Sequence, residues 1–217
     1  MANKSGKAYA LTLLCPILPG IPSNPQPGLE GQAYVACLRY QLQQVRLSEE
    51  SPMSKVPNTY LCRFYVLEDV FYQGKPSLRE NLKSNYLVFS SNFHGELDDY
   101  LKGMWRVVET EVRFILNHCV GFSQVTDEAS FIAYIKKCQV KTTFFFNGST
   151  DEPLAEQLKA LYLKQEFSKF VFENQGKRPA ELQAAFRQFV QRAQPDNVAN
   201  PTWKAGAYHL DRVVSQK

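Results

Sequence analysis

The sequence predicts an α+β protein with a four-stranded antiparallel sheet, helices against that sheet, and two further helices at the C-terminal end. Short runs rich in apolar, aromatic and β-branched residues alternate with longer segments whose apolar residues recur every three or four positions. The chain has 217 residues, of which 44% are hydrophobic and 13% aromatic, which is enough for a substantial core. We therefore expect one α+β domain over residues 1–150 and a helical extension over 151–217 that packs on the same core.

The first half of the expected domain contains a strand, a helix and a second strand. Residues 8–15, AYALTLLC, form a short apolar run typical of a buried strand. A loop rich in proline and glycine ends this strand, because proline cannot continue a hydrogen-bonded ladder. Residues 29–46 have helical spacing of their apolar positions. Residues 59–72, TYLCRFYVLEDVFY, are rich in the aromatic and β-branched types that favour a strand.

The second half is centred on residues 84–121, SNYLVFSSNFHGELDDYLKGMWRVVETEVRFILNHCVG. This stretch predicts a strand over 86–93, a polar turn, and a long amphipathic helix that begins near Gly95 and ends at the glycine of NHCVG. Acidic residues in the first turn of the helix favour the positive end of its dipole. A shorter helix over 127–138 and a strand over 141–147 complete the domain.

The predicted order of strand, helix, strand, strand, helix, strand is the βαββαβ pattern of a ferredoxin-like antiparallel sheet with helices on one face. Such a sheet leaves its other face without helices. We expect that face to pack on a second copy in a homodimer, or to be covered by the C-terminal helices predicted over 153–175 and 179–193.

Composition excludes several classes of protein. The net charge is +4, and the basic residues form neither a run nor a stripe, so nucleic acid is not expected as a partner. No apolar stretch approaches the ~20 residues that a membrane span needs. The five cysteines are odd in number and show no CxxC spacing, which predicts free thiols in a reducing compartment and a cytoplasmic location.

Common catalytic motifs are missing from the sequence. We find no GxGxxG, GxxxxGK[ST], HExxH, GxSxG or EF-hand loop. Three scattered histidines and no cysteine cluster make a classical zinc site unexpected. If the protein is an enzyme, it uses a bound cofactor or a cofactor-free pocket.

A few polar residues are candidates for a site. His118 ends the long helix, where an imidazole can ligate haem iron or act as a general base, or simply stabilise the negative end of the dipole. Ser91, Asn92 and His94 stand at a strand-to-helix junction, which can bind an anion or carbonyl oxygen, or can be a capped turn. Arg63 lies within an apolar strand, which predicts a structural ion pair or an acidic ligand.

Four segments, PILPG, SPMSKVPNTYLCRFYVLED, LVFSSNFHGELDDYL and ILNHCVGF, resemble an uncharacterised bacterial and fungal family with blocks of the kind HFARFVVID, LLFSSNFDGxLDxYL and xHCxGYP. The resemblance covers roughly residues 10–146. The matching residues are Arg63, Ser91, Asn92, Gly95, Asp98, Tyr100, His118, Cys119 and Gly121. Two positions depart from the blocks, because Tyr60 replaces the family's histidine and His94 replaces its aspartate.

That family is similar to the dimeric α+β barrel group, which includes dye-decolourising peroxidases, chlorite dismutases and small cofactor-free monooxygenases. Some members are encoded near, or fused to, haem peroxidases or lipid-oxidising enzymes. The resemblance implies a ligand-binding or oxidoreductase-like protein for a small apolar or lipid-derived molecule. We expect its pocket between the sheet and the helices. The expected catalytic residues are Arg63 and His118, and the expected ligand-binding residues are Tyr60, Ser91, Asn92 and His94.

Two alternatives stay open. The protein can be a non-catalytic accessory module that partners a redox enzyme of the peroxidase type. It can also be a haem protein with His118 as axial ligand, although the haem-ligating signature of dye-decolourising peroxidases is absent.

Overall fold

The computed structural model describes residues 3–70, 72, 74–76, 78, 81–148 and 151–204. The chain divides into two compact units. Unit 1 comprises Met1–Arg46 and Glu50–Asp151, and unit 2 comprises Leu47–Glu49 and Glu152–Lys217. Each unit is described by itself below.

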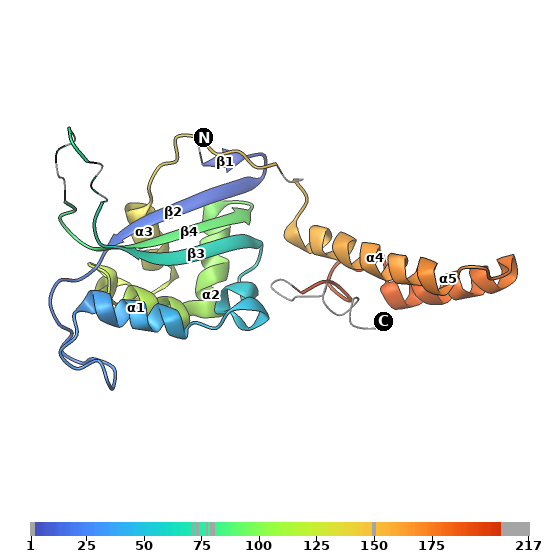
Figure 1. Ribbon diagram of the computed structural model, residues 1–217, viewed down its shortest axis with the longest axis horizontal. Helices are drawn as coiled ribbons and strands as arrows, with labels where there is room; N and C mark the ends of the chain where they lie inside the picture. Colours follow the sequence, from blue (N-terminus) through green and yellow to red (C-terminus); the bar gives the residue numbers. More distant parts are fainter. Residues whose placement is uncertain are drawn as a thin grey trace. The chain divides into compact units, whose positions relative to one another are not determined.

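Unit 1 contains a sheet and three α-helices (Figure 1). Its strands are β1 (Lys4–Ser5), β2 (Ala8–Pro16), β3 (Thr59–Leu67) and β4 (Tyr86–His94). Its helices are α1 (Tyr34–Gln44), α2 (Leu97–Leu116) and α3 (Glu128–Cys138). Its short 3-10 helices are η2 (Pro52–Lys55) and η3 (Phe122–Gln124). A further 3-10 helix, η1 (Ser48–Glu50), has Ser48 and Glu49 in unit 2 and Glu50 in unit 1. The predicted α+β class is therefore confirmed.

The four strands form one open antiparallel sheet in the order β1-β2-β4-β3. Leu13 of β2 lies opposite Phe89 of β4, and Phe89 lies opposite Phe64 of β3. The Phe64 and Phe89 rings stack with centroids 4.4 Å apart. Such cross-strand pairs of large side chains help to hold the register of the sheet.

The edge of the sheet beside β2 differs from the prediction. Residues 141–147, predicted as a strand, form a loop with a bend at Thr143 and join no ladder. The chain just before them contacts β2 through main-chain groups at one place, where Leu13 bridges Gln139 and the Val140 N–H donates to the Thr12 carbonyl at 2.9 Å. The unpredicted strand β1 pairs with the other end of β2. Because β1 and residues 139–140 share this edge, neither segment pairs along the full length of β2.

A tight turn joins β1 to β2. Gly6 has φ +60°, and a Cβ built on it would lie 2.1 Å from the Asp151 carboxylate. That carboxylate accepts a 2.9 Å hydrogen bond from the Lys7 backbone N–H. Only glycine fits both the backbone conformation and this close approach.

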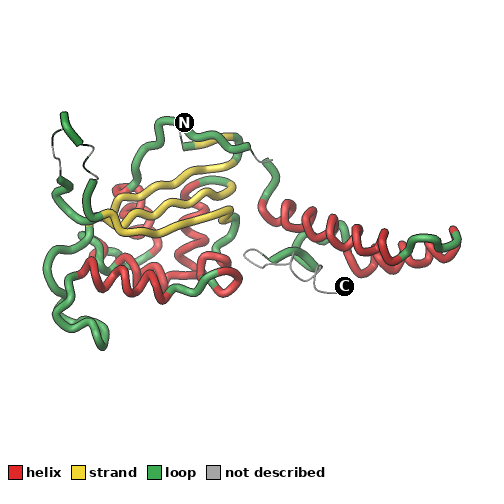
Figure 2. The backbone as a smooth tube through the Cα atoms, in the orientation of Figure 1, coloured by secondary structure: helices red, strands yellow, loops and turns green. Residues whose placement is uncertain are grey.

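The core lies between one face of the sheet and the three helices, as Figures 1 and 2 show. On β2, alternate residues from Tyr9 to Cys15 point into this core. The opposite face of the sheet carries exposed residues of β3, including Leu61 (52% exposed) and Tyr65 (47%). Helix α3 begins with a capping box between Asp127 and Ser130, which satisfies backbone donors of its first turn.

Unit 2 is a hairpin of two helices, α4 (Leu154–Glu173) and α5 (Pro179–Ala193). Ring contacts of Phe167 with Phe189 and of Phe170 with Phe186 show that the helices run antiparallel. Lys159 is only 3% exposed, and its ammonium donates to the carbonyls of Ala193 and Pro201 at 2.7 Å each.

Candidate functional site

The residues predicted to form a site do not converge on one position. Arg63 lies opposite Ser90 on the exposed face of the sheet, and Asn92 and His94 project from the same face of β4. Ser91 points to the opposite face, into the core. The alternation of side chains along a strand separates neighbours in the sequence in this way.

Arg63 is an exposed residue. The ion pair predicted for it is not present with any carboxylate of the described residues. The reason is that Arg63 faces solvent, so its charge keeps its hydration and needs no partner. Leu61 and Tyr65 flank it on the same face of β3.

Ser91 is fully buried and hydrogen-bonded. Its hydroxyl and the Tyr100 hydroxyl of α2 lie 2.8 Å apart, and Thr59 Oγ1 donates to Tyr100 at 3.2 Å. Burial raises the pKa of Tyr100 to about 12. The Tyr100 ring stacks on Phe93 with centroids 3.7 Å apart. Ser91 thus has a structural partner within the core.

The turn from β4 to α2 is closed by contacts of the main chain. The His94 N–H donates to the Asn58 carbonyl at 3.0 Å, and the Gly95 N–H donates to the Lys7 carbonyl at 2.8 Å. The His94 ring nitrogen Nε2 lies 3.1 Å from the Asp151 carbonyl oxygen. Tyr60 is half-buried where the pairing of β3 with β4 is irregular.

His118 lies at the other end of the sheet. Its carbonyl accepts a 2.8 Å hydrogen bond from Leu18, and its ring meets the Tyr34 ring edge-on at 6.0 Å. Burial lowers the pKa of His118, and the nearby carbonyls of Ile115 and Phe114 partly oppose that shift.

The register gives the separation between the two ends. Ser91 lies opposite Leu11, whereas Cys119, which follows His118, pairs with Ile17. At ~3.3 Å per residue, the span from Leu11 to Ile17 is roughly 20 Å. One small ligand cannot contact both Ser91 and His118 across that span.

The space between the sheet and the helices is filled by side chains. A cavity of about 20 Å³ lies there, lined only by apolar residues of β2, β3, β4, α2 and α3. That volume is close to the room that one water molecule needs. This cavity, at the position predicted for an apolar pocket, therefore has no room for an organic ligand in the structure.

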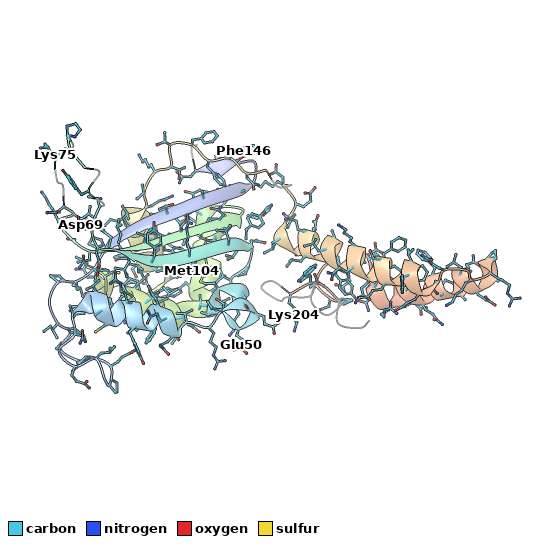
Figure 3. The ribbon with its side chains drawn as sticks, in the orientation of Figure 1. Glu50, Asp69, Lys75, Met104, Phe146 and Lys204 are labelled. Atoms are coloured by element: carbon cyan, nitrogen blue, oxygen red, sulfur yellow. The ribbon has the colours of Figure 1, made fainter. Side chains whose placement is uncertain are left out.

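A much larger pocket of about 340 Å³ lies between the end of α1, the 3-10 helix η2 and α2. We call it the α1–η2 pocket. Figure 3 labels Glu50 and Met104, of which Glu50 belongs to this pocket and Met104 to the core. The lining residues are Gln44, Val45, Arg46, Glu50, Pro52, Lys55, Glu111, Phe114 and Ile115.

Local sequence explains how this pocket forms. Helix α1 ends at Gln44, and the backbone of Val45, the next residue, is extended. Ser51 then caps η2 by accepting a 3.3 Å hydrogen bond from the Met53 N–H, and Pro52 occupies the first position of η2. Serine at the cap and proline just after it favour the start of a helix. The connector therefore folds into a fixed turn beside α2.

Both apolar and charged side chains line the α1–η2 pocket. Ile115 is buried, whereas the Phe114 ring is 40% exposed. Arg46 and Glu50 form an ion pair at 3.3 Å. No ion pair or hydrogen bond joins the side chain of Lys55 or Glu111 to any residue that the structure describes.

The segment SEESPMSKVPN is polar and contains two prolines, a composition typical of a connecting loop and not of a pocket wall. The Ser51-Pro52 pair was the available signal, since it predicts a helical turn. Nothing in the sequence indicates that this turn faces Glu111 of α2, from which β3 and β4 separate it in the chain.

The chain matches no family model, and no significant match is found among curated proteins or solved structures. The resemblance to an uncharacterised family therefore stays a prediction. Among the described residues, no helix is long and apolar enough to cross a membrane. The same residues contain no group of three or more histidine, cysteine, aspartate or glutamate side chains placed to hold a metal ion.

Proposed function

We propose that this protein binds a small organic molecule in the α1–η2 pocket. The observation that carries the proposal is a hollow of about 340 Å³ that both apolar side chains and four charged side chains line. Ligand pockets in proteins commonly have volumes of about 300–1,000 Å³, with apolar walls and a few polar groups that fix orientation.

The wall of the pocket suits an amphipathic ligand. Phe114 and Pro52 offer apolar surface, and burial of a ligand's apolar part against them is favourable. A wholly apolar molecule would remove water from Arg46, Lys55 or Glu111 without replacing their hydrogen bonds, which is costly. The ligand class predicted from sequence, an apolar or lipid-derived molecule, is thus narrowed to one that also carries polar groups.

A titration tests whether the pocket binds at all. Adding 2-phenylethanol to isotopically labelled protein should shift the amide signals of Val45, Phe114 and Ile115 in heteronuclear spectra. Val45→Phe, which places a larger side chain in the pocket, should weaken these shifts strongly. Val107→Phe places the same ring on an exposed position of α2 outside the pocket and should leave them intact. Shifts that persist undiminished in Val45→Phe, or no shifts in the wild type, would reject the proposal.

The ferredoxin-like arrangement is part of this proposal. The spatial order β2-β4-β3 supports it, with α1 between β2 and β3 in the chain and α2 after β4. The contact of residues 139–140 with β2 then occupies the position of the missing last strand.

A homodimer through the exposed sheet face is also proposed. Leu61 and Tyr65 on that face support it, since burial of exposed apolar area drives association. Sedimentation velocity of the wild type and of Tyr65→Glu would test it: a monomeric wild type rejects the dimer. Oxidoreductase-like activity, a haem site at His118 and a redox-enzyme partner stay predictions.

A further inference from the structure

Two charges in the α1–η2 pocket lack partners. Lys55 comes from η2 and Glu111 from α2, so both line the same hollow from different elements. They form no ion pair with each other, and no described residue pairs with either side chain. Two opposite charges that line one pocket without an ion pair between them leave both groups available to a ligand that carries both signs.

The neighbouring charges are already neutralised. Arg46 pairs with Glu50, and both line the pocket. On α2, Glu109 accepts a 2.8 Å hydrogen bond from Arg113, so Glu111 is the carboxylate that this helix leaves for the pocket. Lys55 and Glu111 therefore differ from the other charged residues of this pocket, which have ion-pair partners.

The pocket as a whole carries no net charge. Its lining has two cationic side chains, Arg46 and Lys55, and two anionic ones, Glu50 and Glu111. An anionic ligand is therefore attracted by Lys55 and repelled by Glu111, and for a cationic ligand the two effects are reversed. A ligand with an ammonium group and a carboxylate gains contact with both.

We infer that the ligand is a small zwitterion of the amino-acid type, with its carboxylate toward Lys55, its ammonium toward Glu111 and an apolar substituent against Phe114. This inference rests on the proposed function, since it names the class of ligand for the same pocket. Phe114 is 40% exposed, so its ring has free apolar surface on which the substituent can pack.

Three probes that share a phenylethyl group test the inference: phenylalanine, 3-phenylpropionate and 2-phenylethylamine. The first is a zwitterion, the second an anion and the third a cation, so they differ in charge while keeping the apolar part. Each contact with an exposed charge should contribute about 2- to 5-fold in affinity. In chemical-shift titrations at low ionic strength, we expect phenylalanine to bind several-fold more tightly than either other probe.

Two variants assign the contacts. Lys55→Met should lower the affinity for phenylalanine and 3-phenylpropionate and spare 2-phenylethylamine. Glu111→Gln should lower the affinity for phenylalanine and 2-phenylethylamine and spare 3-phenylpropionate. Lys102→Met and Glu173→Gln make the same charge changes outside the pocket and should alter none of the three affinities.

The outcomes separate the two proposals. Equal affinities for the three probes, or a preference for a singly charged probe, overturn the zwitterion and leave the pocket as a binding site. The absence of any shift at Val45 or Phe114 with all three probes overturns both proposals.

Discussion

Tyr100 of α2 and Ser91 of β4 share a 2.8 Å hydrogen bond beneath the sheet, and Thr59 of β3 donates to the same phenol oxygen at 3.2 Å. One hydroxyl group thus ties the first turn of the long helix to two strands. Ser91, a candidate ligand-binding residue from the sequence, is fully buried in this contact. A buried hydroxyl that has lost its partner is costly, so the network stabilises one arrangement of helix and sheet.

Tyr100→Phe should destabilise unit 1 by about 1–3 kcal/mol, because it leaves the buried Ser91 hydroxyl without its partner. Urea denaturation measures the change. Tyr65→Phe removes a hydroxyl from an exposed tyrosine and should be close to neutral. In the double variant Ser91→Ala with Tyr100→Phe, the loss should be smaller than the sum of the single losses. Additive losses would mean that the two hydroxyls do not interact.

His118 should make stability depend on pH just below its ordinary pKa of 6.5. Its folded-state pKa is lowered by burial, so the unfolded chain takes up a proton first as pH falls. Stability from the neutral ring is therefore complete above pH 6.5 and is lost as pH falls toward the folded-state pKa, with a slope of at most about 1.4 kcal/mol per pH unit. Denaturation at several pH values should give a flatter profile for His118→Gln than for the wild type. Identical profiles would contradict the prediction.

The thiols should react slowly in the folded protein. Burial raises the pKa of Cys62 to about 11, and hydrogen bonding with Cys119, together with burial, raises that of Cys15 to about 12. Only the thiolate attacks alkylating reagents, so few molecules are reactive near pH 7.5. Intact-mass analysis with iodoacetamide should show slow modification of these two residues, and prompt modification of all five cysteines in denaturant. Rapid labelling of Cys15 without denaturant would be inconsistent with this environment.

Lys159→Met should release the chain that follows α5. The ammonium of Lys159 is the donor to the carbonyls of Ala193 and Pro201, and its loss leaves both acceptors without this partner, at a cost of about 1–3 kcal/mol. Hydrogen exchange of residues 194–201 should become faster. Lys164→Met, at an exposed position of the same helix, serves as the control and should leave exchange unchanged.

Local patterns predicted most elements of unit 1. The apolar spacing in α2 and the alternating apolar residues of β2 depend only on nearby residues, which is why the helix and the strand could be placed. The predicted strand over 59–72 is too long, since β3 ends at Leu67. Glu68 instead pairs with Arg39 of α1 at 2.9 Å.

Pairing between distant segments was not predictable in the same way. Whether residues 141–147 form a strand depends on the competing strand β1, which no local pattern indicated. The orientation of Arg63 depends on which face of β3 the helices cover, and both faces of that strand carry apolar residues. Glu111 and Lys55 are ordinary surface residues in the sequence, and only the folded connector brings them to one pocket.

The segment that holds β1 in place is synthesised long after β1 itself. The Asn3 side chain donates to Thr142 Oγ1, 139 residues later, and to the Ala10 carbonyl. At about 5–20 residues per second, roughly 7–28 s of synthesis separate these two partners. During that interval the outer edge of β2 has no segment from residues 139–142 beside it. The nascent chain therefore exposes an unpaired strand edge that the finished protein shields.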